Sequence, residues 1–166
     1  MAELRVESRD GAVYVGLEVR TTMPDIPAKV GPAFDEVAAY LSHRGEVGVG
    51  AEVIRYRRVA LDAPFAIDVG LTVDVAPAGR DRYVVRELTA GRYAVAEQRG
   101  PYSTIGALTK ELMDWCDAEG HEVAMTLGED GAPDEFACWY ELYPSAPVEG
   151  PLGMEGPVQV CLLLRD

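Results

Sequence analysis

The sequence has few of the features that mark membrane or secreted proteins. No run of about 18 apolar residues, roughly the length that a membrane-spanning helix needs, occurs in the chain. The opening stretch MAELRVESRD is charged, so we also expect no signal peptide. These absences predict a soluble protein of the cytoplasm with no membrane partner.

Basic residues are scarce as well. The 166 residues include 15 Lys and Arg against 28 Asp and Glu, which gives a formal net charge of −13. Binding to the phosphate backbone of nucleic acids depends on clustered Lys and Arg side chains. We therefore expect no direct nucleic-acid binding. An acidic surface favours solubility and, weakly, cationic ligands.

Cysteine and histidine are too few to suggest metal chemistry. The three cysteines, Cys116, Cys138 and Cys161, have no metal-type spacing, and we expect buried free thiols. The histidines, His43 and His121, lie at or just after predicted helix ends, where a positive charge suits the helix dipole. The segment GVGAEV lacks the glycine spacing and the Lys of a phosphate-binding loop. The sequence predicts no metal and no cofactor.

What the sequence does have is an internal similarity. Placing AVYVGLEVRT (12–21) over GRYAVAEQRG (91–100) aligns Tyr14 with Tyr93, and a Glu and an Arg in each segment also coincide. Several matches at one shift suggest a duplication. The match fades after the opening strands and helices, so two unrelated halves of similar composition are the alternative.

Each repeated strand leads into a helical pattern and then into two more strand-like segments. Apolar residues recur at helical spacing in both halves: Phe34, Val37, Ala38 and Leu41 in the first, and Ile105, Leu108, Leu112 and Cys116 in the second. We expect Gly45 and Gly120 to end these helices. The pattern predicts one α+β domain over 1–166, built from strand-helix-strand-strand modules at about 3–78 and 82–166. It favours an antiparallel sheet with the helices on one face.

The segment FACWYELYPS (136–145) predicts a strand with aromatic residues on both faces. Side chains alternate along a strand, so Trp139, Glu141 and Tyr143 share one face. We expect the other set to face the helices: Phe136, Cys138, Tyr140 and Leu142. The set with Glu141 is then expected to join Tyr14, Tyr93, Asp68 and Gln159 on the face without helices.

A carboxylate between two aromatic rings indicates a ligand site. Ring faces attract positive charge, and a nearby carboxylate neutralises a cation. No Lys or Arg lies two positions from Glu141, which favours a ligand-binding role over a surface ion pair. Two other strand glutamates are expected to pair on a solvated face, Glu18 with Arg20 and Glu97 with Arg99. The predicted guest is an organic cation or a large, flat, apolar molecule.

Several segments resemble one known family. LTAGRYAVAEQRGPYSTIGALTKELMDW (88–115) is similar to the central motif of the GyrI-like, or effector-binding, small-molecule domains: a strand ending in a basic residue, Gly-Pro-Tyr, and a helix with Trp near its end. CWYELYPS resembles the strand that supplies the family's acidic ligand-contacting residue, and IDVGLTV resembles its strand in the first half. The family occurs at the C-terminus of AraC- and MerR-type regulators and as stand-alone proteins.

The resemblance implies two modules related by a pseudo-twofold axis, with a ligand cleft between them. Glu141 matches the family's buried acid, and Tyr102 matches the Tyr of Gly-Pro-Tyr. We add Tyr56 to the expected ligand-binding aromatic residues. Multidrug-sensing members often carry a second Glu and a Tyr on the last strand, where this chain has Gln159 and Cys161. This departure favours a neutral or singly charged ligand over a dication.

The resemblance also sets the functional hypotheses. The chain starts almost directly with its first strand, so we expect no helix-turn-helix domain and instead a stand-alone protein that sequesters or senses lipophilic, planar or cationic compounds. One alternative is a hydrolase of cyclopropane-bearing toxins, with Glu141 as acid and base and Tyr102 as hydrogen-bond donor. Another is an acidic module that binds a protein partner, such as a gyrase inhibitor.

Overall fold

A computed structural model describes residues 2–44, 48–130 and 132–165 of the chain. Over these residues it has two α-helices, α1 (Ile26–Arg44) and α2 (Ile105–Glu119), each preceded by a short 3-10 helix, η1 (Met23–Asp25) and η2 (Tyr102–Thr104). The strands are β1 (Glu3–Arg9), β2 (Ala12–Thr21), β3 (Val49–Val59), β4 (Phe65–Val73), β5 (Tyr83–Leu88), β6 (Gly91–Pro101), β7 (Met125–Thr126), β8 (Asp134–Tyr143), β9 (Val148–Gly150) and β10 (Gly153–Leu163).

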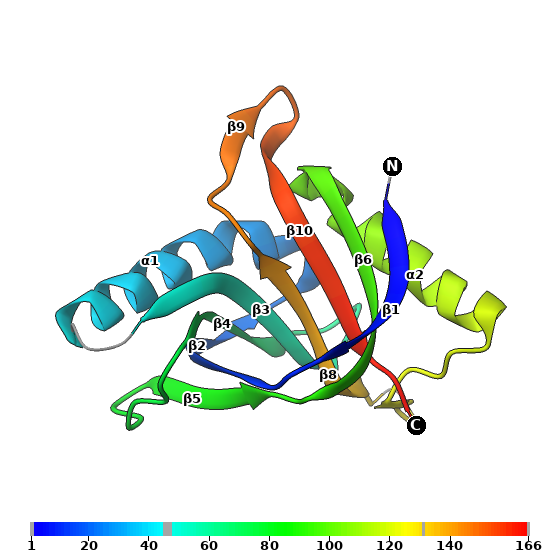
Figure 1. The fold of residues 1–166 in the computed structure, drawn as a ribbon, viewed down its shortest axis with the longest axis horizontal. Coiled ribbons are helices and arrows are strands. Elements are labelled where there is room, and N and C mark those ends of the chain that lie inside the picture. Colours follow the sequence, from blue (N-terminus) through cyan, green and yellow to red (C-terminus); the bar gives the residue numbers. More distant parts are fainter. Residues whose placement is uncertain (1, 45–47, 131, 166) are drawn as a thin grey trace.

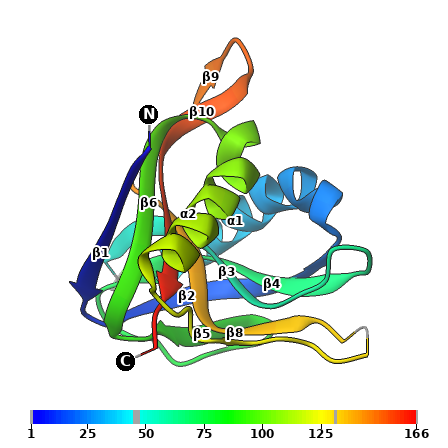
Figure 2. The same ribbon diagram turned by 90° about the vertical axis from the view of Figure 1, so that its right-hand side faces the viewer.

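All strands belong to one antiparallel sheet. Its ten strands run in the order β1-β6-β10-β8-β3-β4-β2-β5, with β7 beside β8 and β9 beside β10. The sheet is strongly bent, and both helices lie on the same side of it (Figures 1 and 2). The prediction of an α+β fold with an antiparallel sheet and helices on one face is confirmed.

The order of elements repeats along the chain. Strand β2 is followed by η1, α1, β3 and β4, and strand β6 by η2, α2, β8 and β10, apart from the short strands β7 and β9. The outer strands cross between these units, because β1 pairs with β6 and β5 pairs with β2. The segments 3–78 and 82–166 therefore each contribute an outer strand to the other. The pseudo-twofold relation between them stays a prediction.

The helices form where the apolar spacing predicts them. The buried residues of α1 are Ala33, Val37 and Leu41, whereas Phe34 is half-buried and Ala38 is exposed. Helix α2 buries Leu108, Thr109, Leu112 and Cys116. It ends at Gly120, whose φ of 76° is the left-handed conformation that glycine adopts easily. The predicted stop of the first helix at Gly45 lies outside the described residues.

Apolar side chains form one layer on each face of the sheet. The larger cluster lies between the sheet and the helices and includes Val15, Leu17, Ile67 and Val69, as the alternation along β2 and β4 predicts. The smaller cluster lies on the other face and contains Tyr14, Tyr93, Tyr140, Cys138 and Cys161. The three cysteines are free and buried, as predicted.

The faces of β8 were predicted the wrong way round. Trp139 and Tyr143 pack in the cluster beneath the helices, while Cys138 and Tyr140 pack on the opposite face. Simple alternation also fails, because Phe136 joins the same cluster as Trp139. The register between β3 and β8 shifts between Tyr56 and Arg58, and the resulting irregularity places Phe136 and Trp139 on one face. Strand β8 is buried on both faces, so its sequence shows no polar side to reveal the orientation.

No helix within the described ranges is both long and apolar enough to cross a membrane.

Candidate functional site

Glu141 lies at the centre of the sheet, on the face that the helices cover. Its strand β8 is held between β10 and β3, and Glu141 is the register partner of Ile54 on β3 and Val160 on β10. The residue is 4% exposed. The hydroxyl of Tyr143 donates a hydrogen bond of 2.7 Å to Oε1 of Glu141. None of the ion pairs among the described residues involves Glu141. A carboxyl group is thus buried without a cationic partner.

Burial changes the acidity of this carboxyl group. Removal from water disfavours the charged form and raises the pKa of Glu141 from 4.5 to about 7, although hydrogen bonding from Tyr143 and Tyr56 lowers it in part. The same burial raises the pKa of both phenols, so they remain protonated donors at neutral pH. Near pH 7, Glu141 can hold or release a proton.

Aromatic rings surround the carboxyl group. Tyr56 stacks on Trp139 with ring centroids 4.3 Å apart, and Phe136 meets Trp139 edge-on at 4.7 Å. On the other side, Tyr143 meets Tyr102 edge-on at 5.3 Å. Both repeated units contribute to this group of rings. Tyr56 lies on β3 of the first unit, and the other rings lie on η2 and β8 of the second. We call Tyr56, Trp139, Glu141, Tyr143 and Tyr102 the Glu141 cluster.

Two residues that sequence reasoning missed lie at the edge of the Glu141 cluster. Phe34 of α1 contacts the ring of Tyr143 with centroids 6.3 Å apart. Glu52 of β3 is the register partner of Tyr143 and is half-buried. Burial, and then the charge of Asp35, raise the pKa of Glu52. Its spacing from Ile54 and Tyr56 could have indicated that it shares their face.

Two donors in the Glu141 cluster lack an acceptor. Nε1 of Trp139 and the hydroxyl of Tyr102 are buried atoms with no hydrogen-bond partner among the described residues. Trp139 is 6% exposed as a whole. Buried polar groups in folded proteins nearly always have a partner, so each of these atoms calls for an explanation.

The remaining predicted site residues lie on the opposite face of the sheet, away from Glu141. They form two polar networks there. Asp68 is fully buried, accepts a hydrogen bond from Tyr14, and pairs with Arg86 at 2.7 Å and Arg57 at 3.3 Å. Its charge is therefore already neutralised.

The second network contains Gln159, and Tyr93 is hydrogen-bonded separately from it. Gln159 donates to Glu97 at 2.7 Å and accepts from Arg9 at 2.8 Å, and the Tyr93 hydroxyl donates to the backbone oxygen of Thr89. The prediction that Tyr14, Tyr93, Asp68 and Gln159 share a face with Glu141 was wrong, because the orientation of β8 is reversed.

The predicted pairing of the two strand glutamates was also wrong. Glu18 pairs with Arg57 at 2.6 Å, and Glu97 pairs with Arg5 at 3.1 Å. Arg5 reaches Glu97 from the adjacent strand β1, and Arg57 reaches Glu18 from β3, across β4. Cross-strand arginines therefore take the place of Arg20 and Arg99.

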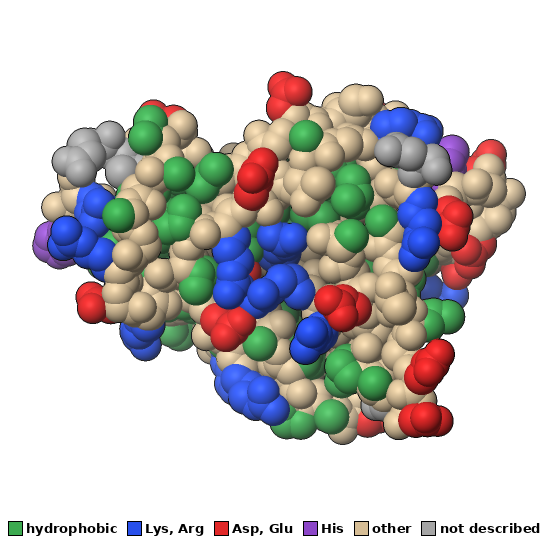
Figure 3. Space-filling model, turned by 90° about the horizontal axis from the view of Figure 1, so that it is seen from below, with side chains coloured by type: hydrophobic (Ala, Val, Ile, Leu, Met, Phe, Trp, Pro, Cys, Tyr) green, Lys and Arg blue, Asp and Glu red, His purple; other side chains and the backbone are tan. Residues whose placement is uncertain are grey.

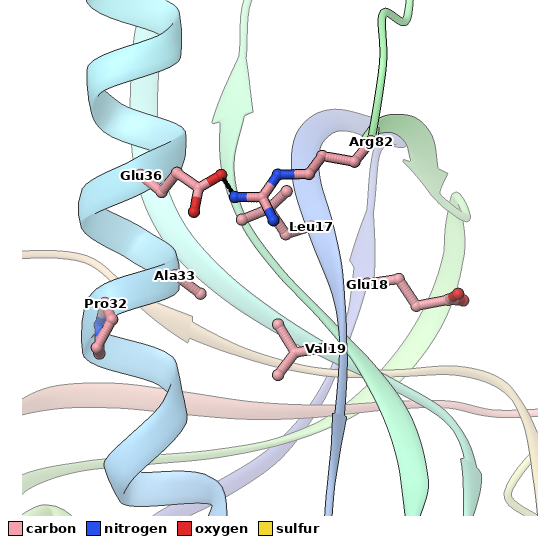
Figure 4. Close-up of a pocket in the computed structure, with 7 residues that line it drawn as sticks. All are labelled: Leu17, Glu18, Val19, Pro32, Ala33, Glu36 and Arg82. Atoms are coloured by element: carbon pink, nitrogen blue, oxygen red, sulfur yellow. Dashed lines mark ion pairs between the residues drawn. The ribbon is translucent and has the colours of Figure 1, made fainter.

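Two surface hollows of the molecule lie away from Glu141. One, of about 380 Å³, lies between α1 and β2, where Glu36 and Arg82 point toward one another over Leu17 and form an ion pair (Figure 4). The other, of about 450 Å³, lies on the face without helices and is lined by residues that include Arg9 and Tyr140. Both open to solvent, whereas the Glu141 cluster is closed. Within the described part of the chain, no group of His, Cys, Asp and Glu is arranged to hold a metal ion.

The raised pKa of Glu141 predicts that the difference in free energy of unfolding between the protein and its Glu141→Gln variant depends on pH. The pKa is about 7 in the folded state and near 4.5 when unfolded, so the native state binds an extra proton in this window. The stability of the unsubstituted protein therefore falls as pH rises from 4.5 to 7, by on the order of 3 kcal/mol from this group. We expect urea unfolding between pH 5 and 8 to show the variant gaining stability relative to the unsubstituted protein as pH rises. A difference that is constant with pH would contradict the assignment.

Known structures share this fold. The C-terminal domain of EcmrR superposes with a TM-score of 0.66 and 10% identity, covering all of this chain and 99% of that one. The structure of SAV2435 bound to tetraphenylphosphonium has a TM-score of 0.60 and 16% identity, covering 98% and 94%. A protein from Listeria innocua described as a hydrolase has a TM-score of 0.59 and 14% identity, covering 98% and 92%. At these identities the likeness establishes the fold alone.

No protein with a curated description matches this chain. The sequence does match the model of a protein family described as the GyrI-like small molecule binding domain, over residues 4–128. The matched region includes β1 to β6, both helices and Tyr102, and it ends before Glu141. This chain belongs to the GyrI-like small molecule binding domain family.

Proposed function

We propose that the chain binds a lipophilic aromatic or cationic small molecule at the Glu141 cluster, for sequestration or sensing of the compound. The observation that carries the proposal is a carboxyl group that is 4% exposed, has no cationic partner among the described residues and is surrounded by aromatic rings. A buried carboxyl group without such a partner costs stability, so a fold that keeps one generally uses it.

The chemistry of the Glu141 cluster suits a lipophilic cation. Ring faces attract positive charge by about 0.5 to 2 kcal/mol each. The deprotonated form of Glu141, which predominates above its pKa of about 7, supplies the counter-charge in a site that excludes water. SAV2435, which has the same fold, was solved with tetraphenylphosphonium bound, and this supports the proposed ligand class.

Ligand entry requires movement of the rings at the edge of the Glu141 cluster. Glu141 itself is closed off, but Phe34 and Tyr102 are only half-buried. They come from α1 and from η2, which precedes α2. Both helices lie on the same side of the sheet (Figure 2). Rotation of these side chains would open the carboxyl group to a guest from the helix side.

The binding proposal predicts a specific loss of affinity for cations. Tetraphenylphosphonium should bind at pH 8 with saturable quenching of Trp fluorescence, and Glu141→Gln should weaken binding about tenfold or more, because the counter-charge is removed. The control is Glu119→Gln, the same change at an exposed position at the end of α2. It should leave the affinity unchanged. No saturable binding, or equal weakening by both substitutions, would refute the proposal.

A second candidate function is hydrolysis of a strained electrophile. A carboxyl group with a pKa of about 7 is suited to take up and return a proton at neutral pH, and one neighbour in fold is described as a hydrolase. Glu141 would remove a proton from water as the water oxygen bonds to the electrophilic carbon. The carbon–carbon bond of a cyclopropane would break, and the leaving carbon would take the proton. Tyr102 would donate a hydrogen bond to the leaving fragment.

Mass spectrometry tests this second candidate. If it is correct, incubation with a cyclopropane-bearing alkylating compound gives a product heavier by one water, with many turnovers per protein molecule. Glu141→Gln abolishes turnover, and Tyr102→Phe slows it about tenfold or more. Stoichiometric binding without product, or turnover that persists in Glu141→Gln, would exclude this mechanism.

An acidic protein-interaction role stays a prediction. One face of the molecule has Lys and Arg side chains near its middle with acidic side chains beside them (Figure 3). Although the net charge of the chain is −13, the face shown in Figure 3 is therefore not uniformly acidic.

A further inference from the structure

The two unpartnered donors of the Glu141 cluster carry information about the ligand. Three other buried atoms also lack a partner, the Nε atoms of Arg44, Arg55 and Arg57, but each of these guanidinium groups is hydrogen-bonded through another nitrogen. The indole of Trp139 has one donor only, and the Tyr102 hydroxyl is the single polar group of its side chain. Within the described part of the chain, these two side chains are left with no hydrogen bond.

The two donors pack on the two phenols nearest the buried carboxyl group. Trp139 stacks on Tyr56, and Tyr102 packs on Tyr143. The Tyr143 hydroxyl donates to Glu141, and Tyr56 lowers the pKa of that carboxyl group. Trp139 belongs to the buried apolar cluster beneath the helices, and Tyr102 packs against that cluster.

Gly156 keeps space beside one of the donors. A Cβ atom at this position of β10 would lie 3.1 Å from the Tyr102 hydroxyl oxygen, closer than ordinary van der Waals contact. The glycine thus leaves the hydroxyl free of a neighbouring side chain.

An unpartnered buried donor costs stability, because it has lost its hydrogen bonds to water and gained none in the protein. A ligand that supplies the acceptor recovers this loss, and a site with such donors discriminates against analogues that lack the acceptor. A tetraalkyl or tetraaryl onium ion has no acceptor and leaves both donors unsatisfied.

We propose that the preferred ligand is a flat aromatic molecule with hydrogen-bond acceptor oxygens on opposite edges, such as a quinone, and that Trp139 Nε1 and the Tyr102 hydroxyl each donate to one of these oxygens. The proposal rests on the proposed function of the Glu141 cluster and specifies its ligand class. The stacked and edge-on rings provide flat apolar walls, and the two donors fix the orientation of the guest between them. Protonated Glu141 adds a further donor at and below neutral pH.

Equilibrium dialysis with a matched set of probes tests the proposal. The probes are anthraquinone, which has two opposed carbonyl oxygens, anthracene, which has the same ring system without them, and tetraphenylphosphonium. Anthraquinone should bind the unsubstituted protein about tenfold or more tightly than anthracene. Trp139→Phe and Tyr102→Phe should each weaken anthraquinone binding about fivefold or more, because each loses one hydrogen bond, and should weaken anthracene binding by a smaller factor, because only packing is lost there.

The control variant is Tyr140→Phe, which removes a buried hydroxyl from the opposite face of the sheet. It should leave all three affinities unchanged. Because Tyr102 is only half-buried, Tyr102→Phe is the variant expected to fold even if Trp139→Phe does not.

The outcomes separate this proposal from the proposed function. If tetraphenylphosphonium binds through Glu141 but anthraquinone and anthracene bind equally, or the two substitutions leave anthraquinone unaffected, the acceptor proposal is wrong and the binding function stands. If none of the three probes binds, both are wrong.

Discussion

The burial of Glu141 is the constraint around which the helix side of this structure is organised. A carboxyl group taken out of water without a cation is stable only if it is protonated or hydrogen-bonded, and this one is both hydrogen-bonded by phenols and raised in pKa to about 7. The phenols must be held in place, which requires the packed rings of Trp139 and Tyr102. The aromatic rings that bury Glu141, and so raise its pKa, are also the rings that enclose the Glu141 cluster.

The central position of the site follows from the way the two repeated units join. Strands β3 and β8 pair in the middle of the sheet and carry Tyr56, Trp139, Glu141 and Tyr143 on the face beneath the helices. The short 3-10 helices η1 and η2 lead into α1 and α2, and Tyr102 lies on η2. A ligand bound at Glu141, as proposed, would therefore contact both units, and movement of either helix would alter access to it.

The sequence predicted the fold class, the helices and the grouping of Trp139, Glu141 and Tyr143 on one face of β8, but not which face of the sheet this is. Helical spacing in α2 and the residue types around Glu141 are local patterns and can be recognised from the sequence. Strand β8 is buried on both faces and carries an irregularity near Cys138, so no pattern shows which face meets the helices. Asp68 lies on the face without helices, as predicted, but Glu141 does not join it there, and the arginine partners of Asp68 come from β3 and β5.

A crystal structure of the protein grown with tetraphenylphosphonium tests the central claim, that the Glu141 cluster is the ligand site, most directly. We expect the cation within contact of the Glu141 carboxylate, with the rings of Phe34 and Tyr102 displaced to admit it. The account would be contradicted if the cation occupied the hollow at Arg9 and Tyr140 instead and left the Glu141 cluster closed.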